Sequence, residues 1–191
     1  MNSRRGYTLI EVMMALALLA IGATGIFSLQ AVSVHANDFA RDTTEAVTVD
    51  RWWIEQLRRD ALNWNGTQSF PASLAGTQYL KLVPNTMTVG AWFTPTLPDD
   101  PLNGGGIAQG PMGRELEWNA PNGRGKFCAQ MRLSWLRMNR VMRAEVRVWW
   151  FKAGGDRTLY GDCGAGNEDA MQDDTENVQW VYLATTMEPP S

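Results

Sequence analysis

An uncharged stretch near the start of the chain constrains its fold more than any other feature. From Val12 to Asn37 the sequence contains no Asp, Glu, Lys or Arg, and the first half of this stretch is almost wholly apolar. A helix needs about 20 apolar residues to cross a bilayer. The sequence therefore predicts a membrane helix close to the N-terminus.

Glu11 stands at the head of this stretch. A carboxylate inside a membrane helix costs about 2.5–3.5 kcal/mol or more unless it is paired, and no Lys or Arg follows three or four residues later. Cleavage after Gly6 would create a new ammonium group on Tyr7, four residues from Glu11 on the same helix face. The sequence thus predicts cleavage and then charge pairing, within one chain or between neighbouring subunits.

The N-terminus resembles that of type IV prepilins through one run of residues: Arg4, Arg5, Gly6, Tyr7, Thr8, Leu9, Ile10 and Glu11. The resemblance implies that a prepilin peptidase cuts after Gly6 and methylates the new N-terminus at Tyr7, and that Glu11 serves filament assembly. Through residues 9–12, 20–22 and 29–30 the chain looks most like the minor pilin PilV. The resemblance covers roughly the first quarter of the chain.

The resemblance also implies a function, which is that of a minor pilin in a type IV pilus. Such a protein acts in the complex that initiates assembly or at the pilus tip, and serves twitching motility and cell adhesion. Its partners would be other minor and major pilins, prepilin peptidase and the assembly platform of the inner membrane, with a tip adhesin as a further candidate. It would start as a single-pass inner-membrane protein with a periplasmic C-terminal domain, and end in the extracellular pilus. A pseudopilin of type II secretion shares the N-terminal chemistry and remains the nearest alternative.

A secreted binding domain or enzyme with an ordinary signal peptide is the third interpretation. Arg4 and Arg5 would be its basic region, and residues 34–36 form a small-residue cleavage pattern that would leave Asn37 first. However, the apolar run exceeds the roughly 7–15 residues of a signal-peptide core, and Glu11 stands where that core is apolar. Helical periodicity also continues past the supposed cleavage site, which favours the prepilin interpretation.

Residues 7–60 are predicted to form one helix, about 80 Å long at ~1.5 Å per residue. The half up to residue 36 is apolar all round, as lipid or a filament core requires. The second half is amphipathic, with apolar or small residues at spacings of three and four: Phe39, Thr43, Ala46, Val47, Trp53, Ile54, Leu57 and Ala61. Asp50 interrupts this stripe and is expected to pair with Arg51 or with a strand residue.

The expected organisation is a leader at 1–6, a transmembrane or filament-core segment at 7–36, and a globular domain at 37–191 that includes the amphipathic half of the helix. The fold class is α+β and pilin-like, with that half packed on an antiparallel sheet.

The best strand predictions are residues 127–138 and 141–152, which alternate with period two. Apolar side chains share one face of each: Phe127, Ala129, Met131, Leu133 and Trp135 in the first, and Met142, Ala144, Val146, Val148 and Trp150 in the second. A two-residue turn at 139–140 predicts the pairs Trp135–Ala144, Leu133–Val146, Met131–Val148 and Ala129–Trp150, at the cost of placing Arg132 opposite Arg147. Further strands are predicted at 79–83, 88–94 and 178–187, with a short one at 115–118 and a polar loop at 153–176.

The two cysteines, Cys128 and Cys163, predict one disulfide, because an exported chain folds in an oxidising compartment; two buried free thiols are the alternative. By resemblance, this bond would bound the loop that pilins carry near the C-terminus. The net charge of −3, with no basic run after the leader, argues against nucleic acid as a partner.

Enzymatic chemistry is not expected. His35 is the single histidine, so a catalytic histidine set or a multi-histidine metal site is excluded. The acidic residues between 162 and 174 offer oxygen ligands to calcium, but their spacing fits no EF-hand and a solvated loop is favoured. The sequence predicts no catalytic residue, no metal and no cofactor. Trp149 and Trp150 point to opposite faces of a strand, so Trp149 is predicted to be exposed, as a subunit contact, or to lie under a covering loop.

Overall fold

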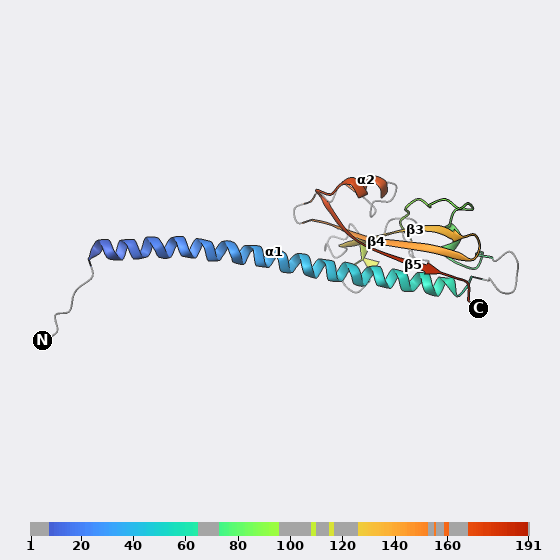
Figure 1. Ribbon diagram of the computed structural model, residues 1–191, viewed down its shortest axis with the longest axis horizontal. Coiled ribbons are helices and arrows are strands. Elements are labelled where there is room, and N and C mark those ends of the chain that lie inside the picture. Colours follow the sequence, from blue (N-terminus) through green and yellow to red (C-terminus); the bar gives the residue numbers. More distant parts are fainter. Residues whose placement is uncertain are drawn as a thin grey trace. The chain divides into compact units, whose positions relative to one another are not determined.

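The computed structural model describes residues 8–64, 73–95, 108–109, 115–116, 126–152, 155, 159–160 and 168–190. Its first element is the helix α1 (Leu9–Ala61), the blue to blue-green ribbon of Figure 1. The chain divides into two compact units between Asp42 and Thr43, so that α1 contributes to both. The predicted single long helix at 7–60 is confirmed to within two residues.

The second unit is built on an antiparallel sheet in the order β2-β1-β3-β4-β5. Three long strands make up most of it: β3 (Phe127–Arg137), β4 (Val141–Phe151) and β5 (Val178–Met187). The short strands β1 (Ala108–Gln109) and β2 (Glu115–Leu116) extend it beyond β3. The fold is therefore α+β, a long N-terminal helix packed with an antiparallel sheet of three long strands and two short ones, in a pilin-like arrangement.

The register between β3 and β4 differs from the prediction by two residues. Trp135 pairs with Met142 and Leu133 with Ala144, because a turn at 138–140 and an irregularity between Trp135 and Arg137 replace the predicted two-residue turn. Asn139 takes φ 56°, a left-handed value that Asn tolerates well. A shift by two keeps every side chain on its predicted face.

The shift also removes the predicted conflict between two arginines. Arg132 lies opposite Glu145, and Gln130 lies opposite Arg147. The prediction that placed Arg132 opposite Arg147 is thus wrong, and the observed register replaces a like-charge pair with an ion pair.

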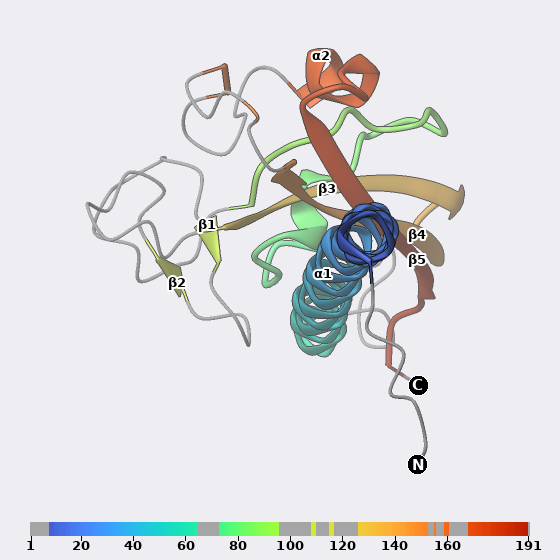
Figure 2. The same ribbon diagram turned by 90° about the vertical axis from the view of Figure 1, so that its left-hand side faces the viewer.

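The core lies between the 43–61 part of α1 and one face of the sheet (Figure 2). The predicted core faces of β3 and β4 are confirmed, and the helix buries Ala46, Trp53, Ile54, Leu57 and Ala61 as its stripe predicts. The stripe is wrong at its start, since Phe39 is 52% exposed. It also omits three residues that the helix buries: Val49, Asp50 and Asp60.

The other face of the sheet is covered by α2 (Glu168–Asp173), which Figures 1 and 2 show on the opposite side of β3–β5 from α1. This helix lies inside the segment predicted to be a polar loop, so that prediction is wrong for 168–173. The strand predicted at 178–187 is confirmed to the residue as β5. The strand predicted at 115–118 is confirmed at Glu115–Leu116.

The predicted strand at 79–83 is wrong, because Leu80–Leu82 form a short 3₁₀ helix, η1. The predicted strand at 88–94 reduces to two isolated bridges, from Val89 to Ser134 and from Phe93 to Met131. Gly90 lies between these bridges, and a Cβ atom there would stand 2.2 Å from the carbonyl oxygen of Leu133. Only a residue without a side chain allows so close an approach.

Candidate functional site

The first turn of α1 is closed by Thr8. The backbone N–H groups of Glu11 and Val12 donate to the Thr8 carbonyl at 3.1 and 3.3 Å, and the Thr8 hydroxyl lies 3.4 Å from the Glu11 nitrogen. Thr at the N-cap with Glu three residues later is the sequence pattern of a capping box. The interpretation of the sequence missed this pattern, which gives Glu11 a favourable place beside the positive end of the helix dipole.

Among the described residues, no hydrogen bond or ion pair involves the Glu11 carboxylate. Gly6 and Tyr7, the residues of the predicted cleavage, lie outside the described part of the chain. The helix begins at Leu9, two residues beyond the Tyr7 at which the mature chain is predicted to start. A chain cut after Gly6 would therefore keep the whole of α1.

The N-terminal unit presents an apolar surface. No described residue between 8 and 42 is buried, and large apolar side chains there are widely exposed, as Leu9 is at 81% and Leu29 at 72%. This part of α1 is long and apolar enough to cross a membrane. Two of its hydroxyl groups bond within the helix: Thr24 donates to the Ile21 carbonyl at 2.8 Å and Ser28 to the Thr24 carbonyl at 3.0 Å. Such internal bonding is what lipid requires of a polar group.

Helix α1 runs without a break through Ala36 and Asn37. A signal peptidase cut at that junction would fall in the middle of a continuous helix. The structure thus gives the ordinary signal-peptide interpretation no extended segment to cleave.

Asp50, in the second unit, is buried and unpaired. Its side chain is 0% exposed, and neither carboxylate oxygen has a hydrogen-bond partner among the described residues. The indole N–H of Trp53, one turn along, also lacks a partner there. Burial raises the pKa of Asp50 from 3.8 to about 8, because a charged group loses solvation in the core. The predicted pairing of Asp50 with Arg51 or a strand residue is wrong.

Asp60 is buried as well, but both oxygens of its carboxylate accept hydrogen bonds. Its carboxylate accepts the backbone N–H groups of Gln78, Tyr79 and Leu80 at 2.6, 2.8 and 3.0 Å. These bonds fix η1 to the end of α1 and satisfy donors that the 3₁₀ helix leaves free. Asp60 thus holds the connection between helix and sheet.

Glu145 organises the outer face of the sheet, the face turned away from α1. It is 1% exposed, pairs with Arg132 at 2.6 Å and Arg143 at 2.7 Å, and accepts a hydrogen bond from the Tyr182 hydroxyl. Burial alone would raise the pKa of Glu145, but the hydrogen bonds from Arg132 and Tyr182 outweigh it and hold the pKa below its usual value. Trp92 covers the cluster, with its ring 4.6 Å from the Arg132 guanidinium.

Trp149 is 0% exposed and belongs to a small apolar cluster on the same outer face, with Cys128, Phe151, Met171 and Val178. Met171 belongs to α2, so the burial of Trp149 is explained by the segment that covers this face. The alternative prediction of an exposed subunit contact at Trp149 is wrong. No free cysteine is found in the described part of the chain. Cys163 lies outside it, so the disulfide stays a prediction.

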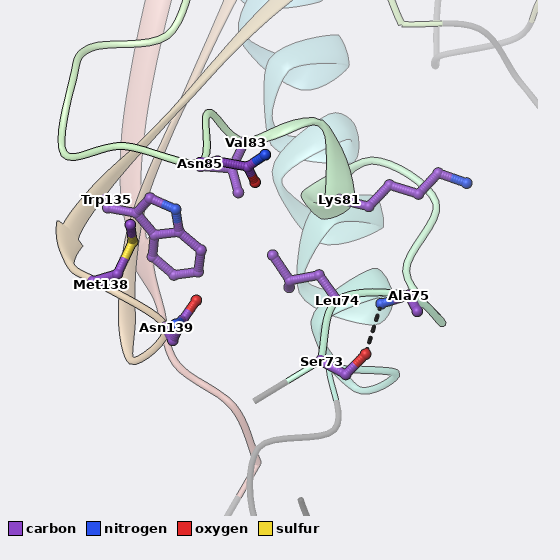
Figure 3. Close-up of a pocket in the computed structure, with 9 residues that line it drawn as sticks. All are labelled: Ser73, Leu74, Ala75, Lys81, Val83, Asn85, Trp135, Met138 and Asn139. Atoms are coloured by element: carbon purple, nitrogen blue, oxygen red, sulfur yellow. Dashed lines mark hydrogen bonds between the residues drawn. The ribbon is translucent and has the colours of Figure 1, made fainter. Parts of the chain in front are cut away.

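A wide pocket of about 580 Å³ opens near the end of the β3–β4 turn (Figure 3). Trp135 and Leu74 face into it, and the Trp135 indole N–H donates to the Pro84 carbonyl at 2.9 Å. Lys81 is the one ionisable residue among the described residues that line it. No described group of three or more His, Cys, Asp or Glu side chains could hold a metal ion.

The comparison with protein families finds one match. Residues 1–27 match the prokaryotic N-terminal methylation motif, the prepilin-type cleavage and methylation signal. No curated protein and no solved structure matches the chain significantly. The match covers Gly6, Tyr7 and Glu11 and ends within the exposed apolar part of α1.

Proposed function

We propose that this chain is a minor pilin of a type IV pilus, processed by prepilin peptidase between Gly6 and Tyr7 and methylated at Tyr7. The observation that carries the proposal is the methylation motif at residues 1–27, which runs directly into a single helix that ends in a sheet-bearing domain. The resemblance to PilV within residues 9–30 adds the finer assignment. The role is structural, with no catalytic activity, cofactor or metal.

The proposed route starts in the inner membrane. The exposed apolar part of α1 spans the bilayer once, and the domain that follows lies in the periplasm. After processing, the chain joins the pilus through other minor and major pilins and the inner-membrane assembly platform, in the initiating or tip complex. A tip adhesin is a further partner, and twitching motility and adhesion are the expected phenotypes.

A deletion strain separates this function from the nearest alternative. Loss of surface pili with intact protein secretion supports the minor pilin, whereas loss of secretion with normal pili would identify a type II secretion pseudopilin. Sequencing the mature N-terminus tests the third interpretation, because prepilin processing leaves methylated Tyr7 and a signal peptidase would leave Asn37.

The processing step is tested by Gly6→Leu. A side chain at the cleavage junction should block the peptidase, so full-length precursor should accumulate in the membrane. Gly22→Leu is the matched control, since a Cβ atom at this glycine of α1 would meet no other atom within 4 Å. Mature-sized protein from Gly6→Leu would disprove the assigned junction.

Two substitutions at Glu11 distinguish the proposed role of its charge in assembly from a role in capping α1. Glu11→Ala removes both, whereas Glu11→Gln removes the charge but keeps the capping-box pattern with Thr8. If pairing with the Tyr7 amine drives assembly, both variants should be processed normally and both should be depleted from sheared pili relative to the membrane fraction. Normal incorporation of Glu11→Gln would show that capping, not charge, explains the residue.

We also propose the disulfide between Cys128 and Cys163. Cys128 is fully buried in β3 and packed in the outer apolar cluster. A bond closing this loop would stabilise the fold by about 3–4 kcal/mol in the chain-entropy account. Alkylation of the denatured, non-reduced protein should leave both cysteines unmodified, and two labelled thiols would rule the bond out.

A further inference from the structure

The strand β5 has one free edge. It pairs with β4 over its whole length, and in the described part of the chain no other strand or bridge involves it. Between its buried ends, Val178 and Met187, every residue is exposed or half-exposed. An edge of this kind presents a row of backbone donors and acceptors that another chain can pair with.

The sequence of β5 lacks the devices that normally block such pairing. Natural edges carry charged side chains, prolines or bulges. Residues 178–187 contain no charged residue and no proline, and the pairing of β5 with β4 is regular throughout. The prolines nearest to the strand, Pro189 and Pro190, come after its end.

Charged side chains of α1 lie beside this edge. A groove of about 400 Å³ separates α1 from β5, and Leu183 and Ala184 form its strand side. Its helix side includes Arg51, Glu55 and Arg58. Glu55 and Arg58 are exposed and 3.7 Å apart, whereas Arg51 is exposed and has no ion pair among the described residues. The groove therefore has an excess of positive charge.

The opposite side of the edge is aromatic. Trp180 and Tyr182 are 38% and 43% exposed and lie on the outer face of the sheet. The Tyr182 hydroxyl is bound to Glu145 and receives a hydrogen bond from Arg143 at 3.1 Å. A fixed aromatic ring on an edge strand suits the apolar or aromatic cross-strand neighbours that stabilise sheets.

We propose that the β5 edge binds an extended segment of another protein as an added strand, with acidic side chains at alternate positions. The acidic side chains would lie on the helix side, over Arg51 and Arg58. The intervening residues would be apolar or aromatic and would lie beside Trp180 and Tyr182. Backbone hydrogen bonds give such a strand its affinity, and alternate side chains give it specificity.

A second copy of this chain is a poorer occupant. Antiparallel pairing of two β5 edges about a two-fold axis normal to the sheet leaves both helices on the same sheet face. Arg51 and Arg58 of both copies would then face each other across the junction, and like charges at close range destabilise an interface. An acidic strand replaces that repulsion with attraction.

The test uses the full-length protein in detergent and a fluorescent ten-residue peptide that alternates Glu with Val and Tyr. The protein carries a net charge of −3, so general electrostatics oppose the binding of this peptide. We expect measurable binding to the wild type by fluorescence anisotropy. A peptide with the same side chains and alternate N-methylated amides should bind at least tenfold more weakly, because it cannot complete the strand pairing.

Charge reversal supplies the second arm. Arg51→Glu combined with Arg58→Glu should lower the affinity for the acidic peptide about tenfold, because two exposed charge pairs change from attraction to repulsion. The same double substitution should raise the affinity for a peptide that carries Lys in place of Glu. Arg59→Glu is the matched control, because Arg59 is exposed on the same helix but does not line the groove. Tryptophan fluorescence confirms that each variant is folded.

Three outcomes of the peptide-binding measurements would overturn the inference. They are no binding of the acidic peptide up to its solubility limit, equal binding of the N-methylated peptide, and unchanged affinity in the double charge reversal. A stable dimer that excludes the peptide would also overturn it, since a second copy would then occupy the edge. The inference does not depend on the proposed pilus function, because neither arm involves processing or assembly.

Discussion

Replacing Asp50 with Asn tests the one buried carboxylate that the described core leaves without a partner. Asp50 is 0% exposed, and burial raises its pKa from 3.8 to about 8. It lies outside the apolar, membrane-length part of α1, in the unit that carries the sheet. The residues of β3, β4 and β5 that pack in this core are apolar and offer the carboxylate no partner.

The sign of the effect follows from the raised pKa. Between pH 4 and pH 8 the folded protein holds a proton on Asp50 that the unfolded chain releases, so stability falls as pH rises. Each unit of pKa difference is worth about 1.4 kcal/mol. From pH 5 to pH 8 the wild type should therefore lose about 4 kcal/mol from this residue alone, an upper value if the core relaxes around the charge. For a chain of this size, that corresponds to a fall of about 10 °C in Tm.

The assay is thermal unfolding of the full mature protein in detergent at pH 5, 6, 7 and 8, followed by tryptophan fluorescence. Asp50→Asn should lose most of the pH dependence and become more stable than the wild type at pH 8. Glu55→Gln is the control, since Glu55 is exposed on the same helix and its side chain stays in water in both states. A wild type whose Tm rises from pH 5 to pH 8, or an Asp50→Asn variant with the same pH profile as the wild type, would refute the reasoning.

Three further predictions concern stability, each measured as Tm with folding checked by circular dichroism. Asp60→Ala should cost about 3 kcal/mol, because it leaves one half-buried and two buried backbone N–H groups of residues 78–80 without their acceptor; a change below ~1 kcal/mol would contradict this role of Asp60. Gly90→Ala should cost about 1–3 kcal/mol through overpacking against the β3 backbone, and an unchanged Tm would show that the segment moves freely. Glu145→Gln should cost about 2 kcal/mol at neutral pH, and little at acid pH. The lowered pKa of Glu145 means that its stabilisation is present above the unfolded value of 4.5 and is lost as pH falls; an equal cost at pH 3 and pH 7 would contradict this.

The sequence predicted those features that depend on periodicity. The long helix, the strand at 178–187 and the core faces of β3 and β4 follow from spacings of three to four and of two, which survive local irregularities. The strand register did not follow, because the longer turn at 138–140 and one irregular residue between Trp135 and Arg137 together move the pairs from Trp135 onward by two residues without changing their faces. The mismatch of Arg132 with Arg147 already indicated in the sequence that the predicted register was unfavourable, as did Arg140 at a turn position that favours a positive φ.

The polar interior was beyond sequence reasoning for a different reason. Asp50 and Asp60 look alike in the sequence, as carboxylates within an amphipathic helix. Asp60 is satisfied by backbone donors of a segment 18 to 20 residues away, and Asp50 meets none among the described residues. Nothing local to either residue distinguishes them. The capping pattern at Thr8 and Glu11, in contrast, was visible in the sequence and would have supplied a second explanation for Glu11.

The two units are stabilised in different ways, and this difference bears on function. The sheet-bearing unit buries its own core, from Ala46 on α1 to Met187 on β5. The described residues from 8 to 42 bury nothing, although they include Leu9, Leu29 and many other large apolar side chains. An apolar surface of that extent requires a cover, and residues 8–42 do not supply one to each other. A bilayer can supply it without any specific contact, and the same side chains can pack against other helices once the chain leaves the membrane. Polar groups that already bond within their own helix, such as Thr24 and Ser28, suit both environments. The N-terminal half of α1 is therefore compatible with transfer from lipid to a helical assembly, which is the step that the proposed function requires.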